Sequence, residues 1–119
     1  MCSSDLTACA EPLEVVSGCV AVTEKLLKDC GLPSHQIDLF EIHEAFAATV
    51  IKTREILGID DERLNVNGGV IALGHPMGAT GAIMTGTLID ELARQQLYRG
   101  IVAASGAAGS GSALLIERY

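Results

Sequence analysis

Apolar residues recur at helical spacing in three segments of the chain. The first helix is predicted to begin after Ser17, a residue type that caps helix N-termini, and to end at Gly31. Its apolar stripe consists of Val20, Val22, Leu26 and Leu27. A second helix is predicted from Glu44 to Gly58, with apolar positions at Phe46, Val50 and Leu57. The third carries an apolar stripe of Met84, Leu88 and Leu92.

Four short apolar runs between and after these helices are typical of buried strands: 37–42, 70–73, 101–104 and 113–116. The predicted order is therefore helix, strand, helix, strand, helix, strand, strand. Such an order indicates a layered α/β domain built on a mixed sheet.

The first ten residues show neither periodicity nor a clear cap, so residues 1–10 are interpreted as a ragged N-terminus before a domain at 11–119. On this interpretation the strand that would open the domain is absent. Two origins remain open for residues 2–6. They are a natural, poorly ordered terminus, or the translated end of a sequencing adaptor, which would make them an artefact.

Composition narrows the class of protein. A chain of 119 residues fits one domain, and a net charge of -7 without a run of Lys and Arg argues against nucleic acid as a partner. No stretch is long and apolar enough to predict a membrane span, so a cytoplasmic location follows by default. The spacing of the four cysteines matches no metal or redox motif, which predicts reduced structural thiols.

Two histidines stand at positions typical of chemistry. His75 lies between Gly74 and Pro76 just ahead of a predicted helix, where the positive end of the helix dipole disfavours the imidazolium and leaves a neutral base. The alternative is a histidine whose hydrogen bonds are satisfied within the loop. His43 and Glu44 stand where a strand becomes a helix, although this signal is weak alone and a polar strand end and a first-turn helix charge explain it more simply.

A third candidate is the segment 105–111, SGAAGSG, which is almost free of side chains. Its backbone N–H groups could bind an oxyanion, or the segment could be a tight hairpin between two buried strands. Neither glycine-rich segment has the spacing of a nucleotide-binding loop.

Together, HEAFAA at 43–48, NVNGGVIALGHPMGATGA at 65–82 and SGAAGSG ahead of LLIER resemble the thiolase family in order and spacing. PLEVVSGCVAVTEKLL at 12–27 extends the resemblance, which covers nearly all of 11–119. It implies the C-terminal half of the thiolase fold, a βαβαβαββ unit with helices on both faces of a mixed sheet, here with its first strand truncated. The HEAF sequence is similar to the branch that includes trifunctional β-oxidation thiolases.

The resemblance implies an acyltransferase of the acetyl-CoA acetyltransferase or 3-ketoacyl-CoA thiolase type, with CoA thioesters as substrates, no covalently bound cofactor and no metal. His75 would activate the nucleophilic cysteine, and His43 and the N–H of Ala107 would stabilise an oxyanion. Ala45 and Phe46 would line the acyl and pantetheine tunnel.

Two departures from the family follow from the same resemblance. The nucleophilic cysteine belongs to an N-terminal half outside this chain, so that half is an expected partner, the chain alone should be inactive, and a homo-oligomer is expected only of the full-length protein. Ser105 occupies the acid/base cysteine position, and a hydroxyl exchanges protons poorly near neutrality. The alternatives are a decarboxylating condensing enzyme, which the GHP sequence disfavours, and a non-catalytic CoA-ester-binding or interaction domain.

Overall fold

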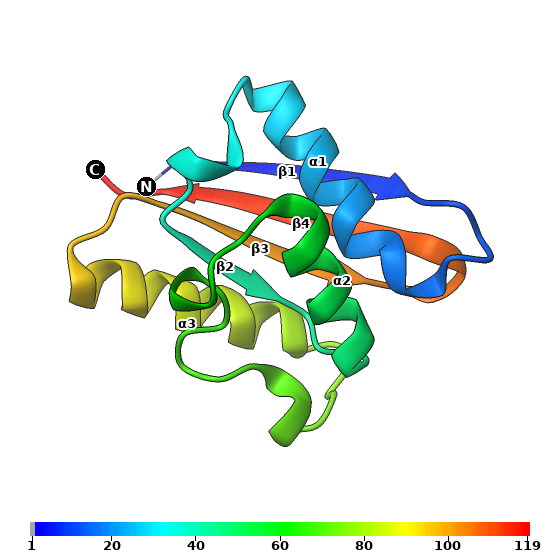
Figure 1. The fold of residues 1–119 in the computed structure, drawn as a ribbon. Helices are drawn as coiled ribbons and strands as arrows, with labels where there is room; N and C mark the ends of the chain where they lie inside the picture. The colour runs from blue at the N-terminus through cyan, green and yellow to red at the C-terminus, as the bar shows by residue number, and fades with distance from the viewer. Residues whose placement is uncertain (1) are drawn as a thin grey trace.

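The computed structural model describes residues 2–119, with side chains from Asp5 onward, as one sheet of four strands packed against three α-helices (Figure 1). The strands are β1 (Cys2–Cys9), β2 (Leu39–Ile42), β3 (Arg99–Ser105) and β4 (Ser110–Glu117). The helices are α1 (Gly18–Cys30), α2 (Ala47–Leu57) and α3 (Thr80–Gln95).

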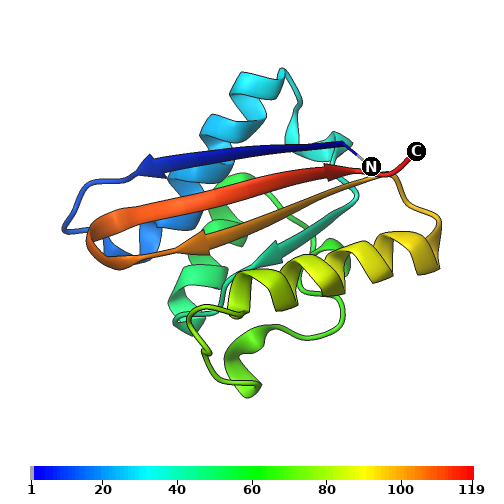
Figure 2. The same cartoon turned by 180° about the vertical axis from the view of Figure 1, so that it is seen from behind.

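The sheet is mixed and covered on both faces. Its strand order is β1-β4-β3-β2, with β2 parallel to β3 and the other pairs antiparallel. Helices α1 and α2 cover one face and α3 the other (Figures 1 and 2). Because side chains alternate along a strand, Ile101 and Ala103 of β3 join the core under α1, whereas Val102 joins the core under α3. The predicted α/β class is confirmed.

Helix ends follow the glycine signals in the sequence. Gly31 ends α1 with φ 67°, and its N–H donates to the carbonyls of Leu27 and Lys28. Gly58 ends α2 in the same left-handed conformation, with φ 62°. A side chain is strained at such a φ, whereas glycine is not, so these two stops could be predicted from the sequence.

The predicted absence of an opening strand is corrected by β1, which pairs along its whole length with β4, from Cys2 opposite Glu117 to Cys9 opposite Ser110. Leu6 and Ala8 pack against the core under α1, but the residues around them are polar. An edge strand gains its hydrogen bonds from the backbone, so it forms here without the apolar pattern that a buried strand shows.

Two further elements differ from the prediction. The expected strand at 70–73 is a single 3-10 turn, Val70–Ala72, in which only Val70 is buried, while Ile71 and Leu73 are 60% and 67% exposed. Gly68 and Gly74 flank this turn with φ of 80° and 81°, which turns the backbone away from the sheet. Helix α2 begins at Ala47, so Glu44 lies in the loop before it rather than in its first turn.

The structure describes three of the four cysteine side chains. Cys9, Cys19 and Cys30 are free thiols, and the last two lie in α1 as predicted. The side chain of Cys2 lies outside the described residues. Across residues 2–119, no helix has the length and apolar character needed to cross a membrane.

Helix α1 begins in direct backbone contact with the β3–β4 hairpin. A Cβ atom on Gly18 would overlap the carbonyl oxygen of Ser110, and one on Gly111 would overlap the carbonyl oxygen of Gly18. Glycine is therefore required on both sides of this contact, because neither neighbour is a flexible side chain that could move aside.

We predict that Gly18→Ala destabilises the fold by about 2 kcal/mol or more, because the backbone contact must open. Gly86→Ala, in the middle of α3, is the control, because a Cβ there meets nothing within 4 Å. It should stabilise the fold by about 0.5–1 kcal/mol through helix propensity. Urea unfolding followed by circular dichroism measures both, and equal effects would contradict the proposed contact.

Candidate active site

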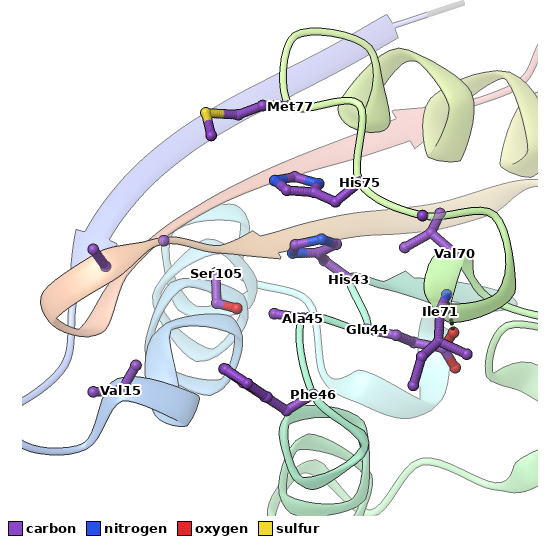
Figure 3. Close-up of a pocket in the computed structure, with 13 residues that line it drawn as sticks. Val15, His43, Glu44, Ala45, Phe46, Val70, Ile71, His75, Met77 and Ser105 are labelled. Atoms are coloured by element: carbon purple, nitrogen blue, oxygen red, sulfur yellow. Dashed lines mark hydrogen bonds between the residues drawn. The ribbon is translucent and has the colours of Figure 1, made fainter.

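One cavity of about 720 Å³ opens at the ends of β2 and β3 (Figure 3). Parallel strands present their carboxyl ends at the same edge, so residues that follow β2 and end β3 meet there. Three segments separated in sequence, 43–46, 70–77 and 105–107, form most of its wall. Every residue predicted for the site lines this cavity: His43, Ala45, Phe46, His75, Ser105 and Ala107.

The two imidazoles lie next to each other in the wall of this cavity. Their ring centroids are 4.8 Å apart and the rings are tilted by 39° (Figure 3). The backbone N–H of His43 donates to the carbonyl of Ala103 at 2.8 Å, which extends the pairing of β2 with β3 by one bond. His43 is 5% exposed, and its Nδ1 finds no hydrogen-bond partner within the described part of the chain.

The environment of His43 favours its neutral form. Burial lowers the pKa of His43, and the charge that His75 can carry lowers it further, although the Ser105 backbone and Glu44 act in the opposite direction. His43 and His75 both line the cavity, so a polar ligand atom can approach the two rings from the cavity side.

A short hydrogen-bond chain selects the tautomer of His75. Its Nδ1 lies 2.8 Å from the hydroxyl of Thr80, and this hydroxyl donates to the carbonyl of Pro76 at 3.3 Å. In the arrangement that satisfies both bonds, the Thr80 hydroxyl donates to Pro76 and accepts the Nδ1–H of His75. Nε2 of the neutral ring is then free to accept a proton, which is the property of a general base.

Glu44 joins the loop that carries His75 to the loop that carries His43. Its carboxylate accepts the N–H of Ile71 at 2.9 Å and is 3.4 Å from the side-chain amide of Asn65. A Cβ on Gly69 would overlap this carboxylate, so the glycine allows the close approach. The sequence indicated Glu44 only as a helix charge or a generic strand-end residue, and nothing in its local pattern pointed to these distant partners.

Asn65 supports the strand that leads to His43 and was not predicted from the sequence. Its side-chain amide mimics a neighbouring strand, because Oδ1 accepts the N–H of Ile42 at 2.8 Å and Nδ2 donates to the carbonyl of Ile42 at 3.1 Å. Its backbone has φ 46°, a conformation that asparagine tolerates better than most residues. Both backbone groups of Ile42 are therefore held next to the site.

The third wall is the tip of the β3–β4 hairpin. Ser105 ends β3, and Figure 3 shows its hydroxyl pointing toward Ala45. Ala107 begins a 3-10 turn, Ala107–Gly109, so its N–H has no acceptor within that turn. The segment forms a tight hairpin between β3 and β4, and Ala107 at its tip lines the cavity.

Apolar side chains surround this polar centre. Phe46, Ile71 and Met77 are 59%, 60% and 83% exposed at the cavity, and Val15 lies on the opposite side of it (Figure 3). A polar centre with an apolar surround can bind a molecule that joins a polar reactive group to an apolar arm. Within residues 2–119, three or more His, Cys, Asp or Glu side chains nowhere come together as a metal-ligand set.

A buried carboxyl group lies two residues before His43 on the same face of β2. Glu41 is 4% exposed, and burial raises its pKa to about 7, with further contributions from Glu44 and Glu91. Glu91 differs because Arg94, Asn67 and Gln95 hydrogen-bond to it and lower its pKa to about 2. Glu41 therefore carries a proton through much of the range in which other carboxyls are ionised.

The fold and this cavity define the class of protein as an α/β domain with a two-histidine site at its strand ends. The family profile of the thiolase C-terminal domain matches residues 2–118, and the chain belongs to the thiolase family. The predicted resemblance is thereby confirmed. The matched range includes β1, in keeping with its pairing in the sheet.

Several known proteins are similar to this chain. The crystal structure of an acetyl-CoA acetyltransferase from Bacillus anthracis superposes with a TM-score of 0.89 and 39% identity, over 95% of this chain and 29% of that one. A 3-ketoacyl-CoA thiolase of Bacillus subtilis is 45% identical over 89% of this chain and 27% of its own length. A peroxisomal 3-ketoacyl-CoA thiolase of Arabidopsis thaliana is 46% identical over 77% of this chain and 21% of its own. The chain thus spans about a quarter of the relatives it matches.

We predict that stability falls with rising pH because of Glu41. The unfolded carboxyl titrates near the ordinary glutamate pKa of 4.5 and the folded one near 7, so between these values the folded state holds more protons. The free energy of unfolding should then fall across this window, by about 2 kcal/mol. Glu41→Gln should remove the fall and be more stable than the unaltered chain at pH 8.

Urea unfolding at pH 5, 6, 7 and 8 measures this dependence. Glu62→Gln is the matched control, because Glu62 is exposed and its substitution should leave the pH profile unchanged. A profile of Glu41→Gln that parallels the unaltered chain would contradict the assignment.

Proposed function

We propose that the chain is the C-terminal part of an acyltransferase that acts on acetyl-CoA and 3-ketoacyl-CoA thioesters, by thiolytic cleavage or Claisen condensation. The convergence of 43–46, 70–77 and 105–107 on one cavity carries this proposal. The acyl-CoA names of the relatives support it. Coenzyme A would enter as a substrate, with no covalently bound cofactor.

The geometry supports the following catalytic roles. Nε2 of His75 takes the proton of a nucleophilic cysteine, which an N-terminal half supplies, and the resulting thiolate attacks the 3-keto carbon. The thioester oxygens gain negative charge during acyl transfer, and His43 and the N–H of Ala107 are placed to stabilise them. Ser105 occupies the acid/base position.

Substrate binding uses the surround of the cavity. Ala45 and Phe46 contact the acyl and pantetheine chain, for which the exposed ring of Phe46 offers apolar surface. The full-length protein is proposed to be a homo-oligomer. Its location in the cytoplasm stays a prediction, and one relative is named as peroxisomal.

A second function from a different class is a non-catalytic domain that binds CoA esters or another protein. Ser105 in the acid/base position favours it, because a hydroxyl has a far higher pKa than a thiol. The two functions differ in turnover rather than in binding, so an activity assay separates them.

We predict that the full-length protein cleaves acetoacetyl-CoA in the presence of CoA, and that His75→Ala lowers kcat at least 100-fold by removing the general base. Ser105→Cys should raise the rate, because a thiol exchanges protons more readily near neutrality. His35→Ala is the matched control, since this third histidine is exposed and does not line the cavity. Tight binding of acetyl-CoA without turnover in either the unaltered protein or Ser105→Cys would favour the binding domain.

We also predict that the chain expressed alone has no thiolase activity and self-associates. Leu73, Met77 and Ile83 are exposed around the start of α3, and we propose that an N-terminal half packs on this side. Ile83→Glu should reduce the association, whereas Ile56→Glu, on α2 at the opposite face of the sheet, should not. Light scattering measures the assembly, and a monodisperse monomer would contradict the prediction.

A further inference from the structure

The segment that carries His75 has almost no packing of its own. Val70 and Thr80 are buried, but every residue between them is exposed, including His75. The backbone hydrogen bonds of this segment are local, because the N–H of Leu73 donates to Val70 and that of Thr80 donates to Pro76. Apolar contacts and backbone pairing therefore do little to set where this imidazole stands relative to the sheet.

Glu44 supplies a long-range bond to this segment. Its carboxylate accepts the N–H of Ile71, the first exposed residue of the segment, at 2.9 Å. Glu44 directly follows His43, whose own N–H is bonded to the carbonyl of Ala103 in β3. Two consecutive residues thus place one imidazole and, through Ile71, hold the segment that carries the other.

Gly69 points independently to the same contact. Its backbone is extended, with φ -90° and ψ -169°, a conformation that residues other than glycine also adopt. A Cβ at this position would nevertheless overlap the carboxylate of Glu44, and the three heavy atoms nearest to it all belong to that group. Glycine is therefore needed at 69 to leave space for the carboxylate rather than to give the backbone freedom.

Both oxygens of Glu44 face hydrogen-bond donors. Oε2 accepts the N–H of Ile71, and Oε1 is 3.4 Å from the side-chain nitrogen of Asn65, whose amide also holds Ile42 of β2. An ionised carboxylate is an acceptor at both oxygens, so these contacts need no proton on Glu44. Glu44 also lines the cavity, so two roles have to be separated by experiment: holding the segment, or exchanging a proton with substrate.

We propose that Glu44 is a positioning residue, which fixes His75 next to His43 by holding the N–H of Ile71. The proposal rests on the thiolase function proposed above, and it adds a residue that acts through His75 rather than on substrate. A misplacement of about 1 Å can slow an enzyme about 100-fold. Loss of this one bond should therefore slow the reaction although both imidazoles are still present.

The test uses the full-length protein and two readouts. Hydrogen exchange of the peptide around Ile71, followed by mass spectrometry, reports whether the segment is held and needs no turnover. Thiolysis of acetoacetyl-CoA reports whether His75 is in place. In Glu44→Ala the exchange should become faster and kcat should fall about 10- to 100-fold, with little change in KM. Glu55→Ala, at an exposed glutamate of α2 that does not line the cavity, is the control and should change neither readout.

Gly69→Ala disrupts the same contact without removing the carboxylate. The side chain of Glu44 is flexible and should swing away from the added methyl group, so this variant should match Glu44→Ala in both readouts. In the double variant the two losses should not add, because both substitutions remove one interaction. Gly86→Ala, where a Cβ meets nothing within 4 Å, is the control for the glycine substitution.

Glu44→Gln separates holding from proton transfer. The amide oxygen can still accept the N–H of Ile71, so this variant should keep slow exchange and most of kcat. An amide cannot replace a carboxylate that exchanges protons with substrate, so a kcat as low as that of Glu44→Ala would overturn the positioning role.

Three other results would overturn this role while leaving the thiolase function intact. They are unchanged hydrogen exchange in Glu44→Ala, an unchanged kcat in Glu44→Ala, and additive losses when Gly69→Ala is combined with it. Absence of thiolysis in both the unaltered protein and Ser105→Cys would overturn the thiolase function and the positioning role together.

Discussion

The carbonyl oxygen of Ala103 holds the site together. It lies at the end of the short parallel pairing between β2 and β3, where it accepts the backbone N–H of His43 and faces the thiol of Cys19. One backbone group therefore fixes the end of one strand relative to the end of the next and to the start of α1. If this pairing shifted by one residue, the side chain at position 43 would point to the other face of the sheet.

The opposite wall is held by a different kind of interaction. Glu44 accepts the N–H of Ile71 and lies against Gly69, so a single carboxylate connects the segment before α2 with the loop before α3. That loop has little regular structure of its own, and its apolar residues Ile71 and Leu73 are exposed. Side-chain hydrogen bonds thus replace core packing as the constraint on His75, which suits a loop that must leave room for a ligand.

The sequence predicted what depends on local pattern. Helix α1 and its stop at Gly31, the strands β3 and β4, and the set of residues that would line the cavity all followed from periodicity, glycine signals or family resemblance. Strand β1 was missed because an edge strand needs only backbone partners. The contacts of Asn65, Glu44 and Cys19 join segments more than twenty residues apart, and no local pattern encodes such partners.

Three buried polar groups lie at or near this site. Nδ1 of His43 has no partner in the described part of the chain, and burial opposes ionisation of both Glu41 and Cys19. Such groups destabilise a fold, and proteins retain them where a ligand or a reaction uses them.

Because of the backbone contact between Gly18 and Ser110, the two ends of the molecule differ in how well they tolerate inserted residues. At the cavity end, the start of α1 and the β3–β4 hairpin are in direct backbone contact, with no side chains between them. Residues inserted in either element would therefore displace this wall of the cavity. At the other end of the molecule, the turns that follow α1 and α3 contain exposed polar residues. Reporter tags, spacers and natural length variation are best accommodated there.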